Sequence, residues 1–264
     1  MSILIETVKT DAFEMQFFRF GKGNKPFVII PGLSVQSVME AAEAIVETYK
    51  MFTEEYTVFV FDRRLNLPPA YSVKEMARDT AEAIQTLGLH DIHIFGASQG
   101  GMIAQVIAIE YPELVCKLVL GSTTSHVTEY KDPVIDKWIQ LAEAKDRAGL
   151  YLEFGKEIYP QRLFVQYREL LLSAGESVTD TDMERFVILA KGTKGFSVVD
   201  ELDKIQCPVL VIGVVEDRVL DSDATMEIAE KLDCSLYMYT GYGHAAYDTA
   251  PDYKARIYNF FQMQ

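Results

Sequence analysis

Apolar and polar positions alternate near the start of the chain, and a different pattern then takes over. Residues 3–8 and 13–20 are β-rich alternating runs separated by a polar turn, and Gly21-Lys-Gly23 follows the second run. Alternation is typical of a strand with one buried face, so the two runs predict an antiparallel hairpin at the edge of a sheet.

From residue 27 onward, short apolar runs alternate with segments of helical spacing. Almost wholly apolar runs are expected of strands that are covered on both faces. The predicted strands are residues 27–30, 57–61, 91–95, 115–120, 208–213 and 235–240, and the predicted helices are residues 35–51, 72–87, 99–110, 223–232 and 251–261. This order predicts an α/β fold with a mostly parallel central sheet and helices on both faces.

The alternation stops between Ser125 and Ser197, where the chain is rich in aromatic residues and has helical spacing. We therefore predict one α/β core, formed by residues 1–124 and 198–264, that is interrupted by a helical cap at residues 125–197. Long excursions of this kind often carry function, because binding residues concentrate on segments held by a rigid scaffold.

Charge and composition narrow the range of partners. The 264 residues include 25 Lys and Arg against 39 Asp and Glu, a formal net charge of −14. Nucleic acid is therefore not an expected partner, since binding its phosphates requires clustered basic side chains. No segment approaches the ~20 apolar residues of a membrane span, and the N-terminus lacks the pattern of a signal peptide. We expect a cytoplasmic protein that binds a small-molecule substrate and no membrane.

Three cysteines lie at or beside apolar runs, and an odd number does not fit a disulfide framework. We expect Cys116, Cys207 and Cys234 to be buried, reduced thiols.

The strongest chemical signal is Gly96-Ala-Ser-Gln-Gly100, which lies between a predicted strand and a predicted helix. A nucleophile on such a sharp turn has a strained backbone, and its neighbours two positions away must lack side chains so that strand and helix do not collide. Gly96 and Gly100 meet this need. A plain glycine-rich helix start is the alternative, but the strand–turn–helix context favours Ser98 as a nucleophile.

A serine hydroxyl needs a base within reach, and the chain has four histidines. His90 and His93 flank the start of the strand that leads to Ser98, and a five-residue strand is ~16 Å long, so they are too far away. His126, at the entrance of the insertion, is expected at the surface. His244 follows the last predicted strand, at the sheet edge that also carries Ser98, and is the predicted base.

The base must itself be oriented by a carboxylate. Glu216, Asp217 and Asp221 follow a predicted strand at the same sheet edge. Their spacing alone gives only a weak preference for one of them as the orienting acid. We favour Asp217. The resulting order Ser98, Asp217, His244 is the order expected of an α/β-hydrolase.

An oxyanion hole would combine two backbone N–H groups. The predicted donors are Gln99, directly after the nucleophile, and Leu33, in the loop Pro31-Gly32-Leu33-Ser34. A plain Pro-Gly turn explains this loop equally well from its residues alone.

Together these segments resemble the α/β-hydrolase superfamily over nearly the whole chain, and most closely its small cap-bearing serine hydrolases, among them carboxylesterases, carbon–carbon bond hydrolases and enol-lactonases. The matching segments are Ile29-Ile-Pro-Gly-Leu33, Asp62-Arg-Arg64, Phe95-Gly-Ala-Ser-Gln-Gly-Gly101, residues 202–213, Glu216-Asp217 and Gly243-His244. The resemblance implies a triad of Ser98, Asp217 and His244, oxyanion amides from Leu33 and Gln99, and a helical lid over the active site at residues 125–197.

Two segments depart from the usual pattern of that superfamily. Pro31-Gly32 replaces a common His-Gly, and Leu65-Asn-Leu-Pro-Pro69 replaces a glycine-rich run after Asp-Arg-Arg. Neither change removes a predicted catalytic group. Ser98 argues against epoxide hydrolase and haloalkane dehalogenase activity, for which the superfamily uses an aspartate at that position.

The sequence thus predicts a serine hydrolase that acts on a small ester or related acyl compound through an acyl-enzyme on Ser98. One alternative is a carbon–carbon bond hydrolase or cofactor-free perhydrolase with the same triad, and another is a non-catalytic ligand-binding protein of the same fold. No metal-binding motif is present, and no cofactor is expected. The oligomeric state is left open, with a homo-oligomer compatible with the sequence.

Overall fold

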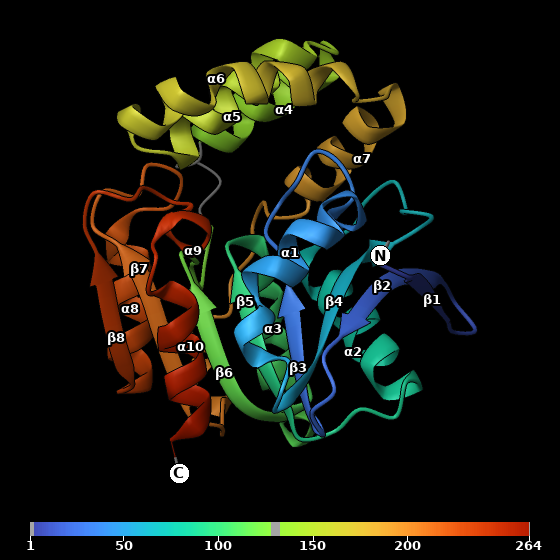
Figure 1. Cartoon of the computed structure of the whole chain (residues 1–264), viewed down its shortest axis with the longest axis vertical. Coiled ribbons are helices and arrows are strands. Elements are labelled where there is room, and N and C mark those ends of the chain that lie inside the picture. Colours follow the sequence, from blue (N-terminus) through green and yellow to red (C-terminus); the bar gives the residue numbers. More distant parts are fainter. Residues whose placement is uncertain (1–2, 128–132, 264) are drawn as a thin grey trace.

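The computed structural model describes residues 3–127 and 133–263, and this part of the chain contains an eight-stranded sheet with the order β1-β2-β4-β3-β5-β6-β7-β8 (Figure 1). The strands are β1 (Ile5–Lys9), β2 (Glu14–Phe20), β3 (Lys25–Ile30), β4 (Tyr56–Arg64), β5 (Ile92–Ala97), β6 (Val115–Gly121), β7 (Val209–Val214) and β8 (Ser235–Tyr239). β1 and β2 form the predicted antiparallel hairpin at one edge, and β2 pairs antiparallel with β4. The other pairs are parallel, which confirms the predicted fold class.

All the parallel strands point toward the same edge of the sheet (Figure 1). Their carboxyl ends meet there, which is where open α/β sheets bind ligands. Ile30, the last residue of β3, is in register with Gly96 of β5, and Ala97 is in register with Gly121 of β6. The loop after β3 therefore starts beside the turn after β5.

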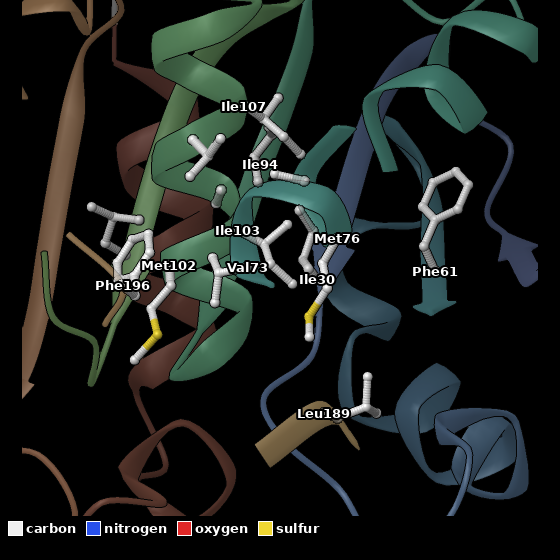
Figure 2. Packing of buried hydrophobic residues seen from close by; sticks show 14 of the residues in the cluster. Ile30, Phe61, Val73, Met76, Ile94, Met102, Ile103, Ile107, Leu189 and Phe196 are labelled. Atoms are coloured by element: carbon white, nitrogen blue, oxygen red, sulfur yellow. The ribbon is translucent and has the colours of Figure 1, made fainter. Parts of the chain in front are cut away.

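Helices cover both faces of the sheet (Figure 1). One face carries α2 (Val73–Thr86), α3 (Gln99–Glu110) and α8 (Ser222–Leu232), and the other carries α1 (Ala42–Thr48), α9 (Ala246–Thr249) and α10 (Tyr253–Gln262). Each layer has its own buried apolar cluster. Figure 2 shows part of the first cluster, in which Ile103 and Ile107 of α3 share the core with Ile94 of β5 and Met76 of α2.

The start and end of α2 follow directly from the local sequence. The side chain of Ser72 accepts a hydrogen bond from the Glu75 amide, and the Glu75 carboxylate accepts one from the Ser72 amide, which makes a capping box. Gly88, with a φ of 68°, lies just past the helix end, where a left-handed conformation favours glycine. Both ends of this helix agree with the prediction.

The single helix predicted over residues 35–51 is instead divided. Ser37 caps a 3₁₀ turn, Val38–Ala41, before α1, and a second 3₁₀ turn, Lys50–Phe52, follows it. The Ser37 hydroxyl also donates to the carboxylate of Asp62, which fixes the residues before the helix in a non-helical path.

The closing helix also begins later than predicted. Residues 251–261 were predicted as helical, whereas α10 begins at Tyr253 and is preceded by the short helix α9. Ala250, directly before Pro251, has an extended backbone with φ of −78° and ψ of 125°, because proline disfavours a helical conformation in the residue before it.

The cysteines are free, but the expected burial was wrong. Cys116 is exposed, and Cys207 and Cys234 are partly exposed. All three lie at or just before the amino ends of strands, at the rim of the sheet opposite the edge at which the parallel strands end. Partial burial raises the pKa of Cys207 and of Cys234 to about 11, so both thiols are protonated at neutral pH.

Among the described residues between β6 and β7 there are four α-helices: α4 (Pro133–Glu143), α5 (Arg147–Ile158), α6 (Gln161–Glu176) and α7 (Asp180–Lys191). We call them the cap helices. They lie beyond the carboxyl ends of the parallel strands (Figure 1). An isolated antiparallel bridge joins His126 to Ser197 where the chain leaves and re-enters the core. None of the helices in the described residues is long and apolar enough to span a membrane.

Candidate active site

Ser98 occupies the sharp turn between β5 and α3. Its φ of 52° and ψ of −121° place it in a conformation that is rare for a non-glycine residue. A side chain at Gly100 would meet the carbonyl oxygen of Ile30 at 1.9 Å, and one at Gly96 would meet the carbonyl oxygen of Gly100 at 2.4 Å. The two glycines therefore permit the close crossing of strand and helix that holds Ser98 at the sheet edge.

Asp217 and His244 form a buried pair at the same edge. The loop after β7 carries Asp217, the segment after β8 carries His244, and Asp217 Oδ2 lies 2.7 Å from His244 Nδ1. The exposed fractions of the two side chains are 2% and 3%. The other carboxylate oxygen of Asp217 accepts hydrogen bonds from the amides of Val219 and Leu220, so its orientation is fixed. With Nδ1 held by Asp217, the Nε2 atom of His244 is left to exchange protons.

The alternative acids make other contacts. Glu216 is exposed, and its carboxylate accepts a hydrogen bond from the Gly241 amide. Asp221 caps the amino end of α8. The sequence distinguished only weakly among these three acids as the partner of the histidine. In the structure, Asp217 is the one that contacts His244.

The remaining histidines lie elsewhere. His93 is buried at the amino end of β5, between the rings of Tyr56 and Phe261. His90 is exposed beside Asp91. His126 is partly exposed, with its Nδ1 atom 3.3 Å from a carboxylate oxygen of Glu227.

The predicted oxyanion donors lie beside Ser98. Gly32 approaches so closely that a side chain there would be 3.2 Å from Cβ of Ser98. Neither the Leu33 amide nor the Gln99 amide donates a backbone hydrogen bond to any acceptor in the described part of the chain. Gln99 is the first residue of α3, where the helix dipole adds partial positive charge. Both N–H groups are therefore free to bind a negatively charged oxygen.

Arg63, at the end of β4, supports this region and was not singled out as a site residue from the sequence. Its Nη2 atom donates to the carbonyl oxygen of Pro31 at 2.8 Å and to the side-chain oxygen of Gln99 at 3.1 Å. Burial lowers the pKa of Arg63 to about 10, which leaves it charged at neutral pH. The sequence offered one signal for this role: Arg63 is a charged residue just after the predicted strand 57–61, at the edge where the parallel strands end.

The cap helices are hydrogen-bonded to the elements that carry these residues. The side chain of Gln99 donates to the carbonyl oxygen of Leu189 in α7 at 2.8 Å, and Arg185 of α7 pairs with Asp62. On the other side, the amide of Ala245, next to His244, donates to the carbonyl oxygen of Ile158 in α5 at 3.0 Å. The position of the cap is therefore coupled to both sides of the candidate site.

A cavity lies between the core and the cap helices. Its walls are Leu33, Ser98, Gln99, Met102, Ile135, Trp138, Phe154, Ile158, Thr193, Val219, Leu220, His244 and Tyr247. The predicted nucleophile, base and oxyanion residues thus line one mostly apolar cavity.

Comparison with known proteins places the chain in a family. Residues 25–251 match the family model described as alpha/beta hydrolase fold. A relative from Agrobacterium fabrum (strain C58 / ATCC 33970), named "Putative carbamate hydrolase RutD", is 25% identical over 198 residues, which cover 74% of this chain and 76% of the relative.

Solved structures share the fold at low sequence identity. One is MGS-M2, an alpha/beta hydrolase enzyme from a Medee basin deep-sea metagenome library, with a TM-score of 0.87, 20% identity and 98% of each chain covered. Another is the enol-lactonase from Burkholderia xenovorans LB400, with a TM-score of 0.83 and 14% identity over 98% of this chain and 100% of that chain. Since the family model spans most of the sequence and the fold agrees, the chain belongs to the alpha/beta hydrolase fold family of enzymes.

Proposed function

We propose that this protein is a serine hydrolase that cleaves a small ester or a related acyl compound through a covalent acyl-enzyme on Ser98. The observation that carries the proposal is the buried Asp217–His244 pair, whose histidine lines the same cavity as Ser98. A histidine oriented by a carboxylate is the arrangement that activates a serine hydroxyl at neutral pH.

The proposed reaction has two halves. Nε2 of His244 removes the proton from Ser98 as its Oγ atom attacks the substrate carbonyl carbon, and the amides of Leu33 and Gln99 stabilise the resulting oxyanion. His244 then returns the proton to the leaving alcohol, and the bond from carbon to that alcohol breaks. Water, activated by His244, hydrolyses the ester on Ser98 and releases the acid. Asp217 stabilises the imidazolium in both halves.

Two further observations support this substrate class. The cavity is lined mainly by apolar side chains from both the core and the cap, which favours a compact substrate of low charge. The names of the relatives, a carbamate hydrolase and an enol-lactonase, refer to cleavage of carbonyl compounds with oxygen or nitrogen leaving groups. We assign the cap helices the role of a lid that forms the outer wall of the acyl pocket.

The test is turnover of short p-nitrophenyl esters and of a p-nitrophenyl carbamate by the wild type, by Ser98→Ala and by Ser122→Ala. Ser122 is a matched control, since it is a buried serine after β6 with a positive φ of 42° and no described partner for its hydroxyl. We expect turnover in the wild type and Ser122→Ala and its loss in Ser98→Ala. Equal turnover in all three proteins would contradict the proposal.

A further inference from the structure

Trp138 forms part of the wall of the cavity. It lies in α4, is 2% exposed, and packs against Phe154 of α5 with 4.3 Å between ring centroids. The same cavity is lined by Ser98 and His244. Trp138 is also the single tryptophan of the sequence.

The indole N–H of Trp138 is buried and has no hydrogen-bond acceptor in the described structure. An indole N–H can only donate, and a buried donor without an acceptor is destabilising. Buried tryptophans therefore usually place this group on a partner. Thr193, which follows α7 and also lines the cavity, already donates its hydroxyl proton to the carbonyl oxygen of Ala190. Among the described residues that the segment between β6 and β7 contributes to the cavity, Trp138 is thus the one with an uncommitted donor.

We propose that the indole N–H of Trp138 donates a hydrogen bond to an acceptor oxygen in the acyl group of the substrate. The inference rests on the proposed function and makes it more specific. It assigns the substrate to short acyl compounds that carry an ether, ketone or second carbonyl oxygen away from the reacting carbonyl, in preference to plain hydrocarbon acyl chains. The cavity walls around the indole are mostly apolar, so one oxygen within a small carbon chain matches them.

The acyl group is the part of the substrate to which we assign this contact, because it occupies the enzyme in both halves of the reaction. The alcohol must leave after the first half, whereas the acyl group stays attached to Ser98 until water releases it. A hydrogen-bond donor of the enzyme therefore contributes to both steps only if it binds the acyl group. A site that pairs a buried donor with a substrate oxygen also discriminates strongly against analogues that lack the oxygen.

The first test moves an oxygen along the acyl chain. Each p-nitrophenyl ester with an ether oxygen (methoxyacetate, 3-methoxypropanoate, 4-methoxybutanoate) is paired with the ester in which CH₂ replaces that oxygen (butanoate, pentanoate, hexanoate). The ratio of kcat/KM within each pair is measured for the wild type, Trp138→Phe and Phe154→Leu. The last variant alters the packing beside Trp138 but keeps the donor.

We expect one oxygen position at which the wild-type ratio exceeds the Trp138→Phe ratio by about tenfold or more, since that variant removes the donor. Phe154→Leu should keep the wild-type ratio even where both rates fall. Comparing variants on the same ester pair removes the intrinsic effect of the oxygen on ester reactivity. Ratios that agree between the wild type and Trp138→Phe at all positions would overturn the inference.

The second test uses Trp138 as the single intrinsic tryptophan fluorophore. Ser98→Ala is titrated with the methyl esters of the same acids, which do not absorb at the excitation wavelength. A hydrogen bond from the indole N–H lowers the energy of its excited state, so the ether ester should shift the emission to longer wavelength than its CH₂ partner does. Identical emission with both esters at saturation would contradict the contact.

The two proposals fail in different ways. Hydrolysis of both ester series by the wild type with unchanged ratios in Trp138→Phe would leave the serine hydrolase function standing and remove the role of Trp138. Absence of hydrolysis with every ester would count against the proposed function itself, and with it against the assignment of an acyl group.

Discussion

Nδ1 of His244 lies 2.7 Å from Oδ2 of Asp217, although 27 positions separate the two residues in the sequence. The sheet brings them together, because β7 and β8 are parallel neighbours and both residues follow the carboxyl ends of these strands. The two amides that bind the second carboxylate oxygen keep Asp217 turned toward the imidazole. This pair is the basis of the proposed activation of Ser98.

Replacing Asp217 with Asn should lower kcat for ester hydrolysis by about 10³- to 10⁴-fold, because an amide neither fixes the required tautomer of His244 nor stabilises its protonated form. Glu216→Gln is the matched control, since that neighbouring carboxylate is exposed and binds the Gly241 amide. Steady-state kinetics with one p-nitrophenyl ester compares the two variants. Similar losses in both would argue against Asp217 as the orienting acid.

Arg63→Gln should reduce kcat by about 10- to 100-fold with a smaller change in KM, because it weakens the support of the Pro31 carbonyl and of Gln99 beside the oxyanion amides. Arg64→Gln serves as the control. Arg64 hydrogen-bonds to the carbonyl oxygen of Ala12, away from Pro31. Steady-state kinetics compares the two variants at equal concentrations of folded protein, with folding checked by circular dichroism. A larger decrease of kcat in Arg64→Gln than in Arg63→Gln would refute this role of Arg63.

Two glycine-to-alanine changes in helices should affect the stability of the protein differently. Alanine is a better helix former than glycine by about 1 kcal/mol. In Gly100→Ala, however, Cβ would lie 1.9 Å from the carbonyl oxygen of Ile30. That oxygen cannot move away, because Ile30 belongs to β3 in the middle of the sheet. We expect Gly100→Ala to destabilise the protein by several kcal/mol, on the order of an overpacked core site or more. Gly175→Ala, whose nearest contact would be 3.4 Å, should be neutral or slightly stabilising. Thermal unfolding of both variants measures the difference, and a Gly100→Ala protein as stable as the wild type would contradict the close crossing.

His93 makes the stability of the fold depend on pH. Burial lowers its pKa from 6.5 to about 4, so between these values the unfolded chain binds a proton that the native protein does not. The contribution of His93 to the free energy of unfolding is therefore fully present above pH 6.5 and falls as the pH decreases toward 4. Between pH 7 and pH 5 the loss is about 2 kcal/mol.

Urea unfolding of the wild type, His93→Phe and His90→Gln at pH 7 and pH 5 measures this contribution. His93→Phe keeps an aromatic ring between Tyr56 and Phe261 and should remove most of the decrease. His90 is exposed, so His90→Gln should behave as the wild type. An equal decrease in all three proteins would assign the pH dependence to other groups.

Local sequence determined much of the fold. The helix after Ser98 was predicted with the bounds Gln99–Glu110 that the structure has, because the glycine-rich turn marks its start. The later start of the helical segment within residues 35–51 was not predictable from spacing, because Ser37 at its beginning contacts Asp62, 25 positions away. The exposure of Cys116 likewise depends on which end of β6 reaches the rim of the sheet.

The candidate site was predictable where strand order alone places residues together. Ser98, His244 and the loop of Leu33 all follow strand ends, so a parallel sheet brings them to one edge. Strand order could not identify Trp138 or Arg63 as residues near the site. Their positions there depend on the direction in which one side chain points from α4 and the other from β4. Helical spacing identifies the aromatic insertion but does not say which ring reaches the cavity.

The most direct test of the central claim is covalent labelling of Ser98 by a fluorophosphonate probe, followed by intact mass and peptide mapping. We predict a single adduct on Ser98 in the wild type and in Ser122→Ala, and its loss in Ser98→Ala and His244→Ala. Loss in His244→Ala would show that the hydroxyl reacts because this histidine activates it. A folded wild-type protein that forms no adduct, or forms it on another residue, would contradict the account.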